Sequence, residues 1–243
     1  MTYCVGLRLN RGLVFMSDTR TNSGVDNVSV YRKMSSWSTP GERAIVLLSA
    51  GNLATTQAVV SILDERTKAP QDRNPSILEA PTMFQVARLV SGALKETIGA
   101  HAEGGESADP TFNSTLILGG QIAGMAPRLF LVYPEGNFVE ALDDTPFLQI
   151  GETKYGRPIL VRAYDPDMTF EDAVKLLLVS FDSTMKANVS VAPPLDLQVY
   201  ETDSLQLAPR HRIEEHDSYL RSISKGWGDA LKAAFTSLDD FTF

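Results

Sequence analysis

The sequence predicts an α+β protein in which two antiparallel sheets lie face to face and each is covered on its outer side by helices, a four-layer αββα sandwich. Two observations carry this prediction. Apolar strand-like runs are joined by tight turns, which favours antiparallel pairing because parallel strands need long crossover connections. Helical segments come in two pairs between the strands, and two helical layers would bury the apolar faces of both sheets.

The chain opens with a predicted hairpin. Residues 3–9 are rich in strand formers, an Asn-Arg-Gly turn follows at residues 10–12, and the apolar run resumes at residues 13–16. A buried strand at the very start of a chain is unusual, because chain ends fray unless they are tied down. A second hairpin is expected from strands at residues 28–37 and 43–49.

The remaining elements follow the same rules. Helices are expected at residues 53–67 and 82–100, where apolar residues repeat at helical spacing. Thr169, with Glu171 and Asp172 behind it, is typical of a capped helix start. We expect further strands at residues 113–118, 128–133, 138–142, 147–150, 195–200 and 205–207, helices at 154–161, 169–186 and 212–236, and surface loops at 68–75 and 101–110.

Composition limits the function classes. With 243 residues, 43% of them hydrophobic, the chain has enough apolar material for one globular domain spanning residues 1–243. The net charge of -8 argues against nucleic-acid binding, which needs a basic face. No apolar run approaches the roughly 20 residues that cross a bilayer, and no export signal is visible, so we expect a soluble cytoplasmic protein that does not bind membranes. The single cysteine, Cys4, leaves no internal disulfide.

Several other polar features have plain structural interpretations. The three histidines, His101, His211 and His216, lack metal-ligand spacing, so we expect surface residues and neither a metal nor a cofactor. The last two are expected on different faces of the final helix. The Gly-Gly-Gln motif at residues 119–121 is interpreted as a turn after a strand. No nucleophile elbow or phosphate-binding glycine loop occurs.

Several short motifs stand at the ends of the expected strands. They are Thr2, Ser17-Asp18-Thr19-Arg20, Lys33, Ser49-Ala50-Gly51-Asn52, Glu135-Gly136-Asn137 and Gly151-Glu152-Thr153-Lys154-Tyr155-Gly156. This set of motifs resembles the catalytic skeleton of proteasome β-type peptidases, which are N-terminal-nucleophile hydrolases. The resemblance covers most of the chain and looks closest to the bacterial Anbu branch, the "ancestral beta subunit".

The resemblance implies that Thr2 is the nucleophile once Met1 is removed. A threonine hydroxyl needs an adjacent base, and here the base would be its own α-amine, whose ordinary pKa of about 7.7 to 8.0 leaves a large neutral fraction. Lys33 would stand beside the hydroxyl and favour the alkoxide, and Asp18 would keep Lys33 charged. Gly51 suits the oxyanion role, because a glycine lets a carbonyl approach its backbone N–H. Thr21 would offer backbone contacts to an extended peptide.

Two departures from the family pattern matter for the site. The interval from Asp18 to Lys33 is one residue shorter than usual. More seriously, Glu152 stands where the family has a serine that orients the amine. Its carboxylate could accept a hydrogen bond from the amine, or raise the pKa of the amine and weaken the base. Three residues, Thr184, Asn188 and Ser190, are left as candidates to complete the site.

The leading hypothesis is therefore a threonine peptidase acting on peptides or proteins as a self-compartmentalised homo-oligomer. The resemblance implies a ring or an open spiral, and leaves unfolding or processing partners unspecified. One alternative keeps the fold but hydrolyses a non-peptide amide or an isopeptide. Another is a ring-forming scaffold with weak catalysis.

Overall fold

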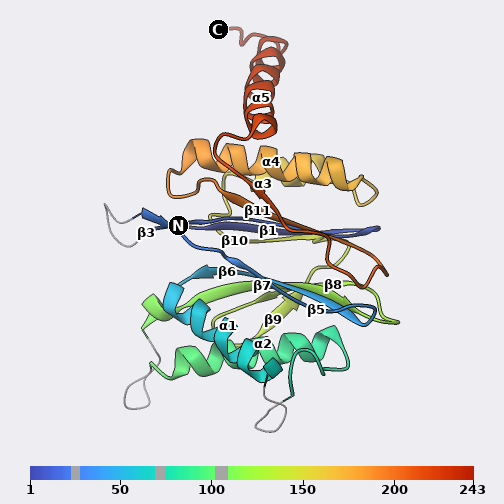
Figure 1. Ribbon diagram of the computed structural model, residues 1–243. Helices are drawn as coiled ribbons and strands as arrows, with labels where there is room; N and C mark the ends of the chain where they lie inside the picture. Colours follow the sequence, from blue (N-terminus) through green and yellow to red (C-terminus); the bar gives the residue numbers. More distant parts are fainter. Residues whose placement is uncertain (23–27, 69–74, 102–108) are drawn as a thin grey trace.

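The computed structural model describes residues 1–22, 28–68, 75–101 and 109–243 and shows the four predicted layers (Figure 1). Two five-stranded antiparallel sheets stack in the middle, with strand orders β10-β1-β2-β11-β12 and β5-β6-β7-β8-β9. The strands are β1 (Tyr3–Leu9), β2 (Gly12–Asp18), β3 (Arg20–Asn22), β4 (Val28–Val30), β5 (Met34–Thr39), β6 (Arg43–Gly51), β7 (Ser114–Ile122), β8 (Arg128–Val132), β9 (Phe138–Glu140), β10 (Phe147–Gly151), β11 (Leu195–Glu201) and β12 (His211–Ile213).

Helices cover the outer face of each sheet (Figure 1). The pair α1 and α2 packs on the β5–β9 sheet, while α3 and α4 pack on the sheet that contains β1. A last helix, α5, rises from α4 and leaves the body of the molecule. The helices are α1 (Leu53–Lys68), α2 (Met83–Gly99), the short 3-10 helix η1 (Pro110–Phe112), α3 (Arg157–Ala163), α4 (Phe170–Ala187) and α5 (Ser218–Thr236).

Side chains alternate between the two faces of each strand, and this divides the apolar core into three parts. In β1, Val5 and Leu7 face the α3/α4 layer, whereas Cys4 points between the two sheets. In β2, Met16 faces the same helices and Phe15 points between the sheets. Successive side chains of a strand lie on opposite faces, so a strand buried on both faces must be apolar at almost every position. This explains the continuous apolar runs of the sequence.

The predicted strand at residues 28–37 is wrong in one respect. The chain pairs with β3 as far as Val30, leaves strand geometry at residues 31–33, and re-enters a different sheet at Met34. Tyr31 N–H donates to Thr19 O (2.7 Å), and Ser49 N–H donates to Lys33 O (2.9 Å). These bonds hold the crossing segment in place, with Lys33 at the crossing point.

The predicted turn at residues 119–121 is also wrong, because these residues continue β7. A side chain at Gly119 would meet the ring of Phe15 at 2.6 Å, so the glycine makes room for the opposite sheet. Gln121 is fully buried, and its Oε1 accepts hydrogen bonds from Tyr200 OH (2.6 Å) and Asp203 N–H (2.8 Å). Hydrogen bonds from Tyr200 and Asp203 to the Gln121 side chain therefore keep residues 119–121 in the sheet.

The C-terminal predictions need two corrections. Residues 205–207 form no strand, since Leu205 has a left-handed backbone with φ of 47°. The closing strand is β12 instead, where Arg212 pairs with buried Asp196 (Nε–Oδ1 2.9 Å), and the helix begins only after its cap, Asp217. All three histidines are exposed as predicted, but His211 lies in β12 and His216 precedes α5, so neither is on the helix.

The predicted loops at 68–75 and 101–110 fall largely on residues outside the described ranges. Across residues 1–22, 28–68, 75–101 and 109–243, no helix is long and apolar enough to cross a membrane.

Candidate active site

The N-terminus is clamped into the sheet that contains β1. Tyr3 pairs with Gly151 of β10, and Glu152 N–H donates to Thr2 O (2.6 Å). Gly151 has φ of +83°, and a side chain there would meet Thr2 O at 2.0 Å, so only glycine permits this close approach. Thr2 is thereby fixed at the end of β1, partly exposed.

Asp18 and Lys33 form a buried ion pair next to this end of β1. Lys33 Nζ lies 2.7 Å from Asp18 Oδ1 and 2.6 Å from the carbonyl oxygen of Arg20. The same Asp18 oxygen accepts a hydrogen bond from Tyr3 N–H (2.9 Å). Asp18 therefore holds both the lysine and the residue that follows Thr2.

Burial governs the electrostatics of the pair. Asp18 is 0% exposed and Lys33 is 6% exposed. Burial raises the pKa of the Asp18 carboxyl, and the ammonium of Lys33 and the hydrogen bonds from Lys33 and Tyr3 act against that rise. Each charge thus depends on the other, since a buried charge without its partner is costly.

Gly51 lies where β6 turns into α1. Its φ is +118°, and a side chain would meet Asn113 O at 2.5 Å, so this position requires glycine. The pairing of β5 with β6 ends at Met34 and Leu48. The edge of β6 at Gly51 is therefore not covered by β5.

The four predicted site residues come together around one small hollow. Thr2, Lys33 and Gly51 line a cavity of about 30 Å³, and Asp18 lies behind Lys33. Thr21 also lines this hollow. Sequence reasoning missed three further lining residues, Tyr31, Leu53 and Thr56, because nothing in their spacing relates them to Thr2.

A larger hollow of about 870 Å³ lies between the ends of β8 and β10 and helix α3. Its lining includes Leu131, Phe147 and Val161, but none of the four predicted site residues. We place the candidate site at the small hollow because the buried ion pair and the clamped threonine are there. The residues that line the two hollows, and not the volumes of the hollows, decide this assignment.

Glu152 is buried beside the N-terminus and is only 5% exposed. Its Oε2 accepts a hydrogen bond from Asn188 Nδ2 (3.0 Å), and its Oε1 accepts one from Lys154 N–H (3.2 Å). Asn188 Nδ2 also lies 3.9 Å from Met1 Sδ. The Glu152–Asn188 pair therefore stands next to the first residue of the chain.

Of the three candidates to complete the site, the structure brings Asn188 to Glu152. Thr184 is fully buried within α4, where its hydroxyl donates to Ser180 O (2.9 Å). Ser190 N–H donates to the side chain of Asn188 (3.0 Å), which orients that amide. The sequence gives no periodic signal that singles out Asn188, because this residue is the C-terminal cap of α4 and lies outside the repeating pattern of the helix.

A second polar network surrounds the hydroxyl of Tyr3, the residue that follows Thr2. Tyr3 OH shares a hydrogen bond with Ser180 Oγ (2.7 Å) and accepts one from Gln149 Nε2 (2.7 Å), and burial raises the pKa of Tyr3 to about 12. Cys4, next along β1, is fully buried, and burial raises the pKa of its thiol. In the described part of the chain, no group of three or more His, Cys, Asp or Glu side chains could hold a metal ion.

A four-layer αββα sandwich with a strand starting at residue 3 and a threonine beside a buried Asp–Lys pair defines the class of proteasome-type, N-terminal-nucleophile folds. Comparison with known families agrees, because a model described as "Proteasome subunit" matches residues 2–197. No curated protein sequence matches the chain.

Solved structures identify the branch. A Gly-1 mutant of Anbu from Hyphomicrobium sp. strain MC1 is 49% identical over 100% of both chains, with a TM-score of 0.92. Anbu, described as the ancestral beta-subunit, from Yersinia bercovieri is 43% identical over 99% of this chain and 100% of that one, with a TM-score of 0.92. A helical assembly of the Anbu complex from Pseudomonas aeruginosa is 41% identical over 99% and 98%, with a TM-score of 0.90. The chain therefore belongs to the proteasome subunit family, in its Anbu branch.

Proposed function

We propose that this chain is an amide hydrolase that uses Thr2 as an N-terminal nucleophile, with residues 1–243 working as one peptidase domain. The observation that carries the proposal is the buried Asp18–Lys33 pair beside a threonine clamped at the end of β1. Membership of the proteasome subunit family supports hydrolysis as the reaction class.

The proposed reaction is acyl transfer in two steps. Thr2 Oγ attacks the amide carbonyl while its proton passes to the free α-amine, and the C–N bond breaks as the leaving amine takes up that proton. Water then attacks the resulting ester, gives up a proton to the α-amine, and releases the acid and the threonine hydroxyl. An α-amine is suited to both transfers because its ordinary pKa of about 7.7 to 8.0 lies near neutrality.

The buried charges assist without changing protonation state. Lys33 brings a positive charge to the hollow where negative charge develops on Thr2 Oγ, and the low dielectric of a buried site strengthens that effect. Asp18 holds Lys33 in place through the 2.7 Å contact between Lys33 Nζ and Asp18 Oδ1. Gly51 offers backbone that a substrate carbonyl can approach, and loss of one oxyanion donor costs about 10² to 10³ in rate.

The mechanism requires a free amine on Thr2, so Met1 has to be removed. Met1 is 64% exposed, which leaves it accessible to an aminopeptidase. The decisive experiment combines intact mass with labelling by a hydroxyl-reactive β-lactone. We expect a mass lacking Met1 and one lactone adduct on Thr2, and no adduct on Thr2→Ala. A trimmed protein that takes up no lactone would contradict the proposal.

A second candidate function, hydrolysis of a non-peptide amide or of an isopeptide, is favoured by two features of the site. The hollow that Thr2 lines is small, about 30 Å³. Glu152 places a buried carboxylate where it can attract an amine of the substrate as well as that of Thr2. Turnover of short peptides compared with small γ-linked and side-chain amides separates the two functions.

We further propose that the enzyme works in the cytoplasm as a self-compartmentalised homo-oligomer, as a ring or an open spiral. The helical assembly of the similar Pseudomonas aeruginosa Anbu complex supports self-association. A scaffold with weak catalysis is the alternative, and it predicts the same assembly without acylation of Thr2.

A further inference from the structure

A second hollow lies next to the small hollow that Thr2 lines, and Tyr31 lines both of them. The second hollow has a volume of about 340 Å³. Its walls come from the segment that crosses between the sheets, from β5, from α1 and from Arg210. We call it the arginine hollow because Arg32 and Arg210 both line it, and we call the small one the Thr2 hollow. None of the four residues proposed for catalysis lines the arginine hollow.

Helix α1 connects the two hollows. Leu53 and Thr56 line the Thr2 hollow, and Val60 and Asp64 line the arginine hollow. Residues three or four positions apart share one face of a helix, so these four follow one another along α1. With a rise of about 1.5 Å per residue, the two pairs are centred roughly 11 Å apart. An extended peptide covers that distance in about three residues, so a substrate held at Thr2 can reach the arginines.

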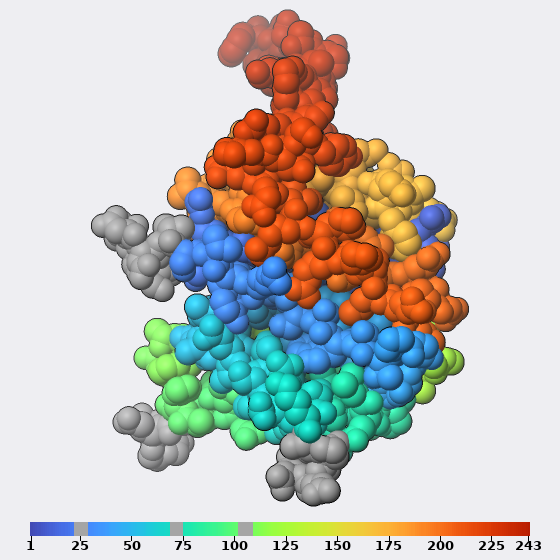
Figure 2. All heavy atoms as spheres, viewed as in Figure 1, coloured from blue at the N-terminus to red at the C-terminus, as the bar shows by residue number. Residues whose placement is uncertain are grey.

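Arg210 reaches the hollow because the segment before β12 runs along the free edge of β5. Gly41 N–H donates to Leu205 O (3.2 Å), and Arg210 Nη2 donates to Ser36 Oγ (3.0 Å). In Figure 2 the orange-red atoms of this segment meet the blue atoms of β5 on the face in view. Arg210 is therefore half-buried, whereas Arg32 is exposed.

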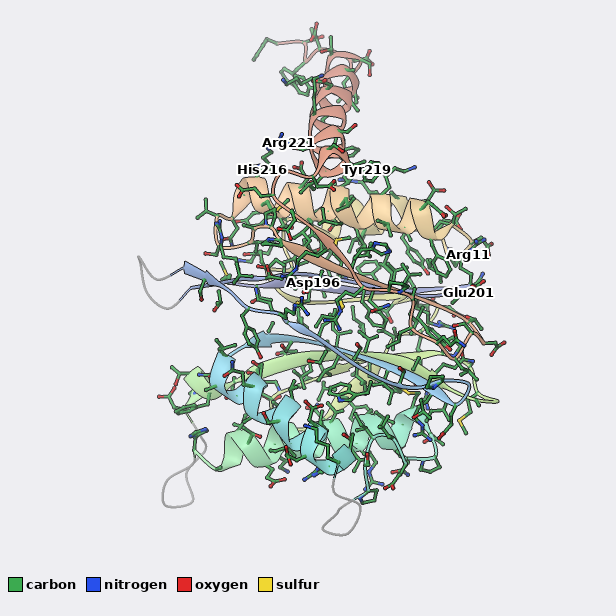
Figure 3. The ribbon with its side chains drawn as sticks, viewed as in Figure 1. Arg11, Asp196, Glu201, His216, Tyr219 and Arg221 are labelled. Atoms are coloured by element: carbon green, nitrogen blue, oxygen red, sulfur yellow. The ribbon has the colours of Figure 1, made fainter. Side chains whose placement is uncertain are left out.

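The positive charge of the two arginines is not neutralised by the residues that the structure describes, because neither forms an ion pair with a carboxylate there. Burial lowers the pKa of Arg210, Asp196 acts against this, and the like charges of Arg32 and Arg212 lower it further. Asp196, labelled in Figure 3, lies in the sheet that contains β1, and both of its oxygens bind Arg212 (2.9 and 3.2 Å). Arg212 is thus neutralised, and Arg210 is not.

Asp64 is the one carboxylate among the described residues that line the arginine hollow. Its Oδ1 accepts a hydrogen bond from Trp37 Nε1 (2.6 Å), on the α1 side of β5. Two guanidinium groups against one carboxylate leave the hollow with a net positive charge. The planar donors of a guanidinium match the two oxygens of a carboxylate. The hollow therefore suits a carboxylate that arrives from outside.

We propose that the arginine hollow is a specificity subsite in which Arg32 and Arg210 bind a carboxylate of the substrate. This inference rests on the proposed function, which places the amide to be cleaved at Thr2. It defines the substrate class as amides with an acidic group about three residues from the bond that breaks. An acidic side chain and a free C-terminus offer the same group, and the experiment distinguishes these two sources.

Peptide binding to Thr2→Ala, measured by isothermal titration calorimetry, tests the subsite without catalysis. The probes are amidated peptides with Glu at one of four successive positions, a matched peptide with Gln at all four, and the Gln peptide with a free C-terminal carboxylate. We expect one Glu position to bind at least about tenfold more tightly than Gln, because a carboxylate paired with arginine makes charge-assisted hydrogen bonds. A preference shown only by the peptide with a free C-terminus supports the subsite and assigns it to the terminal carboxylate.

Variants of the arginines test which residues carry the preference. Arg32→Gln with Arg210→Gln should reduce the ratio of the two dissociation constants to about one. Arg157→Gln with Arg162→Gln removes the same charge from exposed positions on α3, in the other helical layer, and should leave the ratio unchanged. Arg32→Gln alone changes only an exposed side chain, so it should fold normally and reduce the ratio to about threefold.

Turnover by wild type and β-lactone labelling of Thr2 separate this proposal from the proposed function. The preferred peptide should be cleaved about three residues from its carboxylate, as mass spectrometry of the products would measure. Equal binding of Glu and Gln peptides, or a preference that survives loss of both arginines, overturns the subsite, and lactone labelling of the same protein would leave the proposed function standing. An arginine-dependent preference in a protein that takes up no lactone supports the subsite and overturns the proposed function.

Discussion

Lys33 Nζ lies 2.7 Å from Asp18 Oδ1, and this is the most deeply buried ion pair in the described part of the chain. Besides Lys33, the backbone N–H groups of Tyr3 and Arg20 stabilise the Asp18 carboxylate. The carboxylate thus links the lysine to the end of β1 that carries Thr2.

Removal of one partner should therefore be severe. Lys33→Met leaves a buried, unpaired carboxylate, and we expect a loss of about 3–5 kcal/mol in the free energy of unfolding, measured by urea denaturation. Lys33→Met combined with Asp18→Asn removes both charges and should recover much of that stability, yet still fail to label with a β-lactone. A double variant that labels like wild type would show that Lys33 has no part in acylation.

Gly51 can be compared with Gly41, because both have positive φ (+118° and +75°) but differ in their surroundings. An alanine at 41 meets nothing within 4 Å, whereas one at 51 meets Asn113 O at 2.5 Å. Gly41→Ala should cost about 1–2 kcal/mol from backbone strain, and Gly51→Ala about 1–3 kcal/mol more from overpacking. Thermal unfolding of the two variants measures the difference, and equal losses would count against the close contact.

The role of Glu152 can be tested by the pH dependence of Thr2 labelling. A carboxylate close to an amine raises the pKa of that amine. Glu152 Oε2 is bonded to the Asn188 amide, which lies beside Met1, so we expect Glu152→Gln to move the inflection of the labelling rate toward lower pH. Asn188→Ala keeps the carboxylate but removes its 3.0 Å hydrogen bond, and should move the inflection the opposite way. An inflection at the same pH in all three proteins would show that Glu152 does not control the pKa of the Thr2 amine.

The free energy of unfolding at alkaline pH tests the packing around Tyr3, the residue that follows Thr2. Burial raises its pKa from 10.0 to about 12 in the folded protein. Because the folded value is the higher one, the protonated phenol contributes stability that is fully present below pH 10.0 and is lost as the pH rises toward about 12. The unfolding free energy of wild type should fall faster over this range than that of Tyr3→Phe, as urea titrations at each pH would measure. Parallel slopes would rule out this contribution.

Cys4 gives a simple check of the packing between the sheets. The side chain of Cys4 is 0% exposed, so the thiol reaches solvent only when the protein opens. Burial also raises the pKa of the thiol, which makes the folded form less reactive. Reaction with a maleimide at neutral pH should therefore be at least about a thousandfold slower in native buffer than in urea, because it requires opening of the sheet. Fast native labelling would show that β1 detaches readily, and with it Thr2.

The layers could be predicted from the sequence because they depend on local patterns, whereas the family and the four proposed site residues were implied by the resemblance of short motifs. Strand runs, turns and helix caps are short-range signals, and motifs such as the Asp18 and Gly51 segments stand at the ends of strands that such signals define. The αββα order follows, since only two facing sheets bury every apolar face.

Only the tertiary structure decided what depended on partners far away in the chain. Gly119 and Gln121 stay in β7 because Phe15 and Tyr200 contact them from the other sheet. Asn188 joins Glu152, although 36 residues separate them. The chain at Lys33 leaves one sheet for another, and this break brings its ammonium to Asp18. Long-range contacts of this kind leave no periodic trace in a single sequence, because each is set by the packing of whole layers.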